Sequence, residues 1–273
     1  MKAADEKHYL PEQEYDEAIE ELCMCATVIL YSFGTHSTET RDLIIRSFIA
    51  RGTTALKSIL LLWKTDHYHD CWILYRSLVD RLFHLRALAD NDDFLLFDDW
   101  SFVKQYEYRN RAKSDPDFKD TLNPELVKET LEEKERYQEI KKLPPKWKRP
   151  LPEEVANKMG LGFLYKYAYD YASAHVHPMA NDGDEDFGRL TGLTKRDMPP
   201  DRRVILNNSC LILVLLIQEG LNTGTLQWRR VVYDFLDHFM HRLAGESEQY
   251  RVALFKFIKM SEERGLCQKR SSG

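Results

Sequence analysis

The sequence predicts an all-α protein, a multi-helix bundle with a charged, proline-containing excursion between helices. Apolar residues recur at three- and four-residue steps along most of the chain, which is the period of an amphipathic helix. No segment shows the regular apolar–polar alternation of a half-buried strand. Glycine and proline are few, at 12 and 10 of 273 residues, and hydrophobic residues make up 43%. This composition is typical of a compact protein and argues against disorder.

We expect a single helical domain over residues 1–273, with core helices in about 12–112 and 153–264 and the excursion at about 113–152. The predicted core helices are 12–33, 38–63, 66–88, 92–112, 153–160, 163–177, 201–221, 225–243 and 248–264. Gly34 is expected to end the first helix. Gly52 interrupts the second pattern and indicates a close contact with another helix.

The excursion is strongly charged, and residues 124–142 have only a thin apolar pattern, which predicts a solvent-exposed helix. The segment KKLPPKWKRPLPEE follows, and its four prolines exclude a regular helix. It is locally basic, at Lys141, Lys142, Lys146, Lys148 and Arg149. We interpret it as a connecting loop, with a nucleic-acid patch as the weaker alternative. A second loop is predicted over 182–201, which is rich in glycine and proline.

Charge and cysteine usage narrow the class of protein. The formal net charge of −5 gives no overall basic field for nucleic acid. No apolar run approaches the ~18 residues of a membrane-spanning helix, and the acidic N-terminus lacks the apolar core of a targeting segment. The five cysteines lack zinc-type C-x-x-C pairs and are predicted to be reduced thiols. We therefore expect a cytoplasmic protein that does not associate with membranes and needs no cofactor.

One short segment, 163–186, collects tyrosines, a serine, two histidines and an acidic tail. Within it, Tyr169, Ser173 and His177 are spaced by four, so they share one face of a helix. Pro178 disfavours the α conformation for the residue before it, so the helix is expected to end at His177.

A second helix, 66–88, carries Arg76, Asp80 and His84 in register at the same spacing. Two interpretations remain open. The three residues form a solvated or lightly paired helix face, or this face meets Ser173 and His177 across a helix–helix interface.

A metal site is not predicted. His175 and His177 lie about 200° apart around a helix axis, so they do not easily hold one ion together. The acids of 182–186 lack the spacing of a calcium loop. One histidine with Asp182 or Asp184 stays a weaker alternative.

Two short motifs carry a resemblance to a known family: R-S-L-V-D at Arg76–Asp80 and Y-x-x-x-S-x-x-x-H-P at Tyr169–Pro178. The sequence resembles the domain-of-unknown-function 5677 family over about residues 41–242. That family is more distantly similar to the HEPN helical bundles, many of which are toxin or defence ribonucleases. The resemblance implies an all-helical bundle. HEPN nucleases place an arginine four to six residues before a histidine, and no arginine here has a histidine at that distance, so the resemblance does not imply enzyme activity.

Two functions follow as hypotheses, and the sequence leaves open whether the chain is an enzyme. The first is a non-catalytic binding or interaction module, in which Arg76, Asp80, Ser173 and His177 form a buried polar network and the partner is a second copy or another protein. The second is a metal-independent, HEPN-like ribonuclease of a prokaryotic defence or toxin system, with RNA as substrate. There His177 would act as general base and Arg76 would stabilise charge on the phosphate, while Tyr169 or Ser173 would orient the histidine or donate a hydrogen bond to the phosphate.

Overall fold

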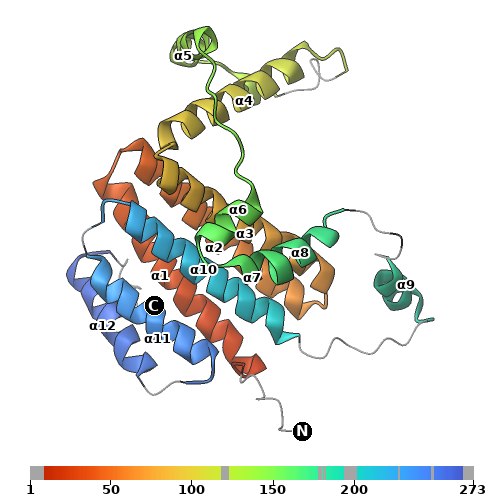
Figure 1. Cartoon of the computed structure of the whole chain (residues 1–273), viewed down its shortest axis with the longest axis vertical. Helices are drawn as coiled ribbons and strands as arrows, with labels where there is room; N and C mark the ends of the chain where they lie inside the picture. Colours follow the sequence, from red (N-terminus) through yellow and green to blue (C-terminus); the bar gives the residue numbers. More distant parts are fainter. Residues whose placement is uncertain are drawn as a thin grey trace. The chain divides into compact units, whose positions relative to one another are not determined.

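The computed structural model describes residues 9–117, 123–177, 180, 183–193, 202–226, 228–246 and 249–266. Over these residues the chain is all-α and contains no strand, as predicted (Figure 1). The chain divides into two compact units, one of Met1–Arg86 with Leu151–Gly273 and one of Ala87–Pro150. Whether they fold as the single predicted domain stays a prediction.

The first unit contains the long helices that form the main core. These are α1 (Tyr15–His36), preceded by the 3₁₀ turn η1 (Glu12–Glu14), then α2 (Thr40–Lys64), most of α3 (Tyr68–Asn91), α10 (Arg203–Thr223), α11 (Arg229–Leu243) and α12 (Tyr250–Glu263). Shorter elements of the same unit are α6 (Pro152–Lys158), α7 (Gly162–Leu164), the π-helical η3 (Tyr165–Tyr169), α8 (Asp170–Ala174) and α9 (Asp184–Thr191).

α2 and α10 pack closely against each other, and each helix contributes a glycine to the contact. A Cβ atom placed on Gly52 would lie 2.8 Å from a methyl carbon of Leu216. A Cβ atom on Gly220 would lie 2.9 Å from side-chain carbons of both Ile45 and Ile49. Both distances are below ordinary van der Waals contact, so the two backbones approach as closely as they do because these side chains are absent. The helix contact predicted at Gly52 is confirmed.

Polar side chains also fix the helices of this unit. Asp42 on α2 is buried and accepts hydrogen bonds from the Thr225 hydroxyl, at 2.5 Å, and the Thr225 backbone N–H, at 3.3 Å. Arg242 on α11 is buried against α1, where it donates to Glu21 and, at 2.9 Å, to Glu17. Buried polar groups need such partners, so each contact specifies one way for the helices to pack.

The second unit consists mainly of α4 (Phe94–Ser114), the 3₁₀ turn η2 (Pro124–Val127) and α5 (Leu131–Lys142). α5 buries no residue completely, as its thin apolar pattern predicted. It begins instead with a capping box. The Thr130 hydroxyl accepts a hydrogen bond from the Glu133 backbone N–H, and the Glu133 carboxylate accepts one from the Thr130 backbone N–H. This arrangement satisfies two otherwise unpaired N–H groups of the first turn and explains why a weakly apolar sequence is helical.

The predictions for Gly34 and for residues 182–201 are wrong. α1 continues through Gly34 to His36, because one glycine inside a helix is disfavoured by only ~1 kcal/mol relative to alanine. Residues 182–201 were predicted as a loop, but 184–191 form α9. Gly183 and Gly192 are the caps of this helix, and Gly192 ends it in the left-handed conformation at φ 68°.

The cysteines in the described ranges are unpaired and buried, at positions 23, 25, 71 and 210. Burial raises the pKa of Cys23 to about 11 and that of Cys71 to about 12. These thiols therefore stay protonated near neutral pH and are poor nucleophiles. Cys267 lies outside the described residues.

Two segments, Glu12–Thr35 and Arg203–Thr223, are long and apolar enough to cross a membrane by length and composition. The sequence prediction had found no such run. More than half of each is buried inside the protein, at 56% and 72% of the most apolar stretch, and core helices pass the same test. The expected absence of membrane association thus stays a prediction.

We predict that Gly52→Val destabilises the protein by about 1–3 kcal/mol, because the added atoms overpack the α2–α10 contact. Thr54→Val is the matched control, since Thr54 lies two residues further on α2 and is exposed. Urea unfolding followed by circular dichroism measures both. Equal stability of the two variants would contradict the close approach of the helices.

Candidate functional site

The segment that carries Tyr169 and Ser173 is helical from Gly162 to Ala174, and its middle, Tyr165–Tyr169, is a π-helical turn. In an α-helix, residues four apart drift by about 40° around the axis. A π turn has i→i+5 hydrogen bonds and is wider, so its residues four apart drift in the opposite direction and offset the drift of the α turns beside it. Tyr165 and Tyr169 accordingly stack, with ring centroids 5.7 Å apart and planes inclined by 22°. Residues at four-residue spacing therefore form aligned rows along this segment.

One row faces α3, where Arg76 is the centre of a closed hydrogen-bond network. Its Nε donates to Ser173 Oγ at 2.8 Å, its Nη2 to the Tyr169 hydroxyl at 2.9 Å, and its Nη1 to Asp80 Oδ2 at 3.4 Å. The Tyr169 hydroxyl donates to Asp80 Oδ1 at 2.9 Å. Ser173 Oγ donates to the backbone carbonyl of Tyr169 at 2.8 Å. Each side chain of the network thus has a partner within it.

The environment of the network makes these contacts strong. The side chains of Arg76 and Asp80 are 25% and 28% exposed, and Tyr169 is 7% exposed. The guanidinium carbon of Arg76 lies 4.8 Å from the centroid of the Tyr169 ring, which adds a cation–π contact. Polar groups removed from water in this way are stabilised only when all are paired. The contact predicted between the two helix faces is present for these residues and Ser173, although their role as a functional site stays a prediction.

His177 and His84 are placed differently from the other predicted site residues. α8 ends at Ala174, before the predicted end at His177, because Ala172 and Ser173 accept i→i+3 hydrogen bonds that tighten the last turn. His177 is exposed beyond that end, and no hydrogen bond to Arg76 or Ser173 is found in the described chain. His84 Nδ1 lies 2.7 Å from the Asp80 backbone carbonyl, within α3.

Sequence reasoning missed a histidine pair beside the network. His69 Nδ1 on α3 lies 3.0 Å from Nδ1 of His175, at hydrogen-bond distance. The Trp72 ring is nearly parallel to that of His175, with centroids 6.3 Å apart, and meets Tyr171 edge-on at 4.9 Å. The available signal was spacing, because Trp72 precedes Arg76 by one helical turn and so extends the same face of α3. The pair gives α3 and the end of α8 a second polar contact.

No group of three or more His, Cys, Asp or Glu side chains converges on a metal-binding position among the residues with described coordinates. Asp182, which the weaker metal alternative required, lies outside them, and Asp184 begins α9. Within the described part of the chain, the metal alternative has no supporting geometry.

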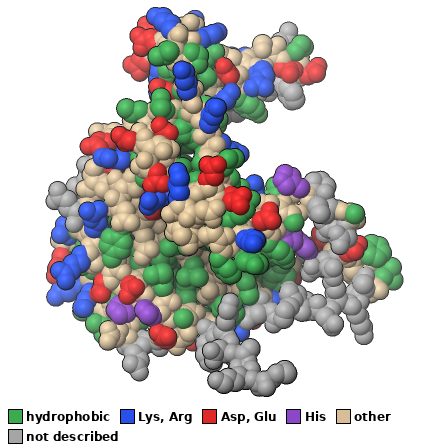
Figure 2. Space-filling model, in the orientation of Figure 1, with side chains coloured by type: hydrophobic (Ala, Val, Ile, Leu, Met, Phe, Trp, Pro, Cys, Tyr) green, Lys and Arg blue, Asp and Glu red, His purple; other side chains and the backbone are tan. Residues whose placement is uncertain are grey.

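A second row on this segment, also at four-residue spacing, is largely exposed. Phe163, Tyr167 and Tyr171 are 72%, 65% and 51% exposed, and the first two rings are in contact, with centroids 5.1 Å apart, whereas the Tyr171 ring also meets Trp72 of α3. We call these three residues the aromatic row. Hydrophobic side chains gather at the surface over α7 and α8 (Figure 2). Large exposed apolar groups that lie together are typical of interaction surfaces.

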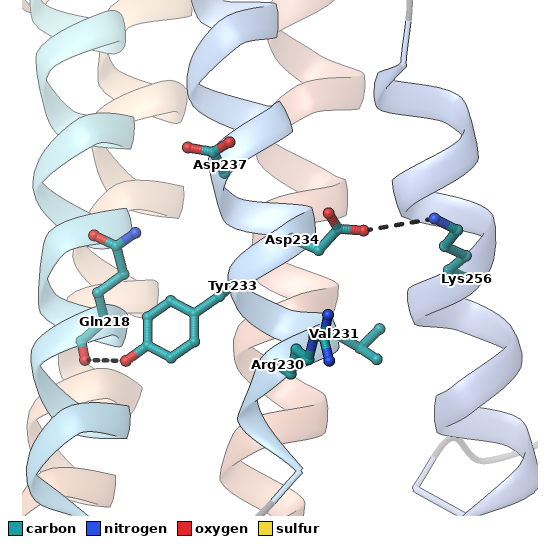
Figure 3. Close-up of a pocket in the computed structure, with 7 residues that line it drawn as sticks. All are labelled: Gln218, Arg230, Val231, Tyr233, Asp234, Asp237 and Lys256. Atoms are coloured by element: carbon teal, nitrogen blue, oxygen red, sulfur yellow. Dashed lines mark hydrogen bonds and ion pairs between the residues drawn. The ribbon is translucent and has the colours of Figure 1, made fainter.

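An open groove of about 600 Å³ lies on α10, α11 and α12, helices that follow the aromatic row in the sequence (Figure 3). It is lined by Gln218, Arg230, Val231, Tyr233, Asp234, Asp237 and Lys256. The Tyr233 hydroxyl donates to the Gln218 carbonyl at 3.2 Å, and Lys256 lies 3.9 Å from Asp234. None of the predicted site residues lines this groove.

Fold and network together define an all-α protein in which a closed polar network joins two helical segments. The chain belongs to the family described as "Family of unknown function (DUF5677)", whose model matches residues 42–192, more than half of its length. The family resemblance is thereby confirmed, and the matched range contains the whole Arg76 network. No curated protein and no solved structure matches the chain, so the more distant HEPN similarity has no support from them.

We predict that Tyr169→Phe destabilises the protein by about 1–3 kcal/mol, because Asp80 and Arg76 each lose a hydrogen-bond partner in a site shielded from water. Tyr167→Phe removes the same hydroxyl from an exposed ring and should change stability by less than ~0.5 kcal/mol. Thermal and urea unfolding of both variants provides the measurement. A Tyr169 variant as stable as the control would mean that the network does not hold α8 to α3.

Proposed function

We propose that this protein is a non-catalytic helical binding or interaction module, in which the Arg76 network holds the α7–α8 segment in position to present a binding surface. The observation that carries the proposal is the closure of the network: Nε, Nη1 and Nη2 of Arg76 all donate to partners within the protein. An arginine that is used in this way is poorly available to bind a substrate. Its role is better explained as positioning one helix against another.

The aromatic row supports a protein partner. Aromatic side chains are enriched at protein interfaces and often contribute much of the binding energy. Here they lie on the segment whose other face Tyr169 and Ser173 fix to α3. A surface that is already ordered before binding loses less conformational entropy when it binds. Self-association is the form of the proposal to test first, because it requires only the purified chain.

Multi-angle light scattering over a concentration series tests self-association. We predict a dimer for the wild type and a monomer for the double variant Phe163→Glu, Tyr167→Glu, because two buried carboxylates in the interface are strongly unfavourable. Phe255→Glu is the matched control, since Phe255 is an equally exposed aromatic residue on α12, and it should remain dimeric.

A wild type that is strictly monomeric at the highest concentration reached would exclude self-association through this surface. Dissociation of the Phe255 control to the same extent would show that the effect is not specific to the aromatic row. Circular dichroism of each variant distinguishes loss of association from loss of fold.

The ribonuclease hypothesis lacks an observation in its favour. It requires Arg76 and His177 to act on one phosphate, and the described contacts of Arg76 do not include His177. We predict that RNA incubated with the protein in a chelator is cleaved no faster than with His177→Ala. Chelator-resistant cleavage that falls by ~100-fold or more in that variant would instead establish His177 as a general base.

A further inference from the structure

A nine-residue stretch after the middle of the chain has a charge opposite to that of the whole protein. Residues 141–149, KKLPPKWKR, contain five cations and no acid, within a chain of net charge −5. We call the five cations the basic strip: Lys141, Lys142, Lys146, Lys148 and Arg149. All are exposed. None forms an ion pair with another residue of the described chain, although the Lys141 ammonium lies 5.5 Å from the Tyr137 ring centroid.

Several other cations of the same unit are paired. Arg109 binds Glu133 at 2.8 Å, Lys113 binds Glu129 at 2.5 Å, and Arg136 binds Asp98 at 2.6 Å and Asp99 at 2.8 Å. Acids of this unit thus neutralise part of the charge of α4 and α5, whereas no cation of the strip has an acidic partner in the described chain. Unneutralised charges of one sign along a short segment produce a local field that attracts an anionic partner.

The strip is also ordered by its neighbours. Trp147 is buried against Phe97 and Trp100, with ring centroids 4.8 and 4.6 Å away. The chain here is not helical. Trp147 is directed into the protein, and Lys146 and Lys148 on either side of it are exposed. The prolines of the stretch fix the backbone φ angle at their positions, which further restricts the conformations of the segment that carries the cations.

We propose that the basic strip binds the phosphate backbone of a nucleic acid strand, without reading its base sequence. A row of lysine and arginine side chains supplies the charge-assisted contacts that phosphates need. Sequence-tolerant base stacking requires an exposed aromatic ring, and the aromatic ring of this stretch is buried. The contact is thus electrostatic. The same burial leaves the stretch without an exposed aromatic ring to anchor it at a membrane interface.

This inference does not rest on the proposed protein-binding function, because it uses none of the aromatic-row residues. It also differs from RNA cleavage. A single-stranded DNA probe has no 2′-hydroxyl, so binding to it is measured without the reaction that the ribonuclease hypothesis requires.

The test is fluorescence anisotropy of a labelled 20-nucleotide oligothymidine, titrated with the full-length protein at 50 mM salt and at several higher salt concentrations. The strip variant is Lys146→Gln, Lys148→Gln, Arg149→Gln. The control is Lys57→Gln, Lys158→Gln, Lys259→Gln, which changes three exposed lysines elsewhere and alters the net charge equally.

We expect the wild type and the control to bind with similar Kd, and the strip variant to bind at least 10-fold more weakly. Neutralised phosphates release about 0.7 counterions each on single strands, so the slope of log Kd against log salt should decrease by about 2 in the strip variant. The proposal is overturned if the control loses affinity equally, if the wild type does not bind at 50 mM salt, or if it binds phosphatidylserine vesicles in preference to the oligonucleotide. Unchanged thermal unfolding of both triple variants verifies that the fold is retained.

Discussion

The hydrogen bonds of Arg76 are the constraint on which the arrangement of the candidate site depends. One guanidinium group joins the side chains of Asp80, Tyr169 and Ser173, and thereby ties α3 to a helical segment too short to be stable by itself. The α7–α8 segment buries few apolar residues, so its position is determined by polar contacts with specific geometry. The aromatic row owes its placement to this network and, at Tyr171, to the edge-on contact with Trp72 of α3.

Much of this site could be predicted from the sequence, because helical spacing is a local property. Four-residue intervals placed Arg76 with Asp80 and Tyr169 with Ser173 before any contact between the helices was known. His177 follows the same interval, but the helix ends at Ala174, so four-residue spacing no longer places His177 on the face of Tyr169 and Ser173. The spacing of Trp72 and Arg76 marked the face of α3 on which His69 also lies, but the contact of His69 with His175 was not inferred from it.

The capping glycines of α9 show a related limit. A glycine inside a helix and a glycine that ends one are the same letter, and the difference lies in the backbone φ angle, which only the structure provides. The reverse case is Gly52, where a glycine in an otherwise clean apolar stripe did indicate close packing.

The family match spans residues 42–192 and thus includes both the aromatic row and the basic strip, whereas α10, α11 and α12 lie beyond it.

The π-helical turn at Tyr165–Tyr169 makes the length of this segment adjustable. A π turn contains one residue more than the α turn that would replace it, so a single-residue deletion there can be absorbed locally. Residues on the far side would then keep their orientation, and Tyr169 and Ser173 would still reach Arg76. Deletion of Lys166, for example, would place Phe163 and Tyr167 three residues apart, and likewise the stacked pair Tyr165 and Tyr169. The outer surface of this segment can therefore change while Tyr169 and Ser173 stay anchored to α3.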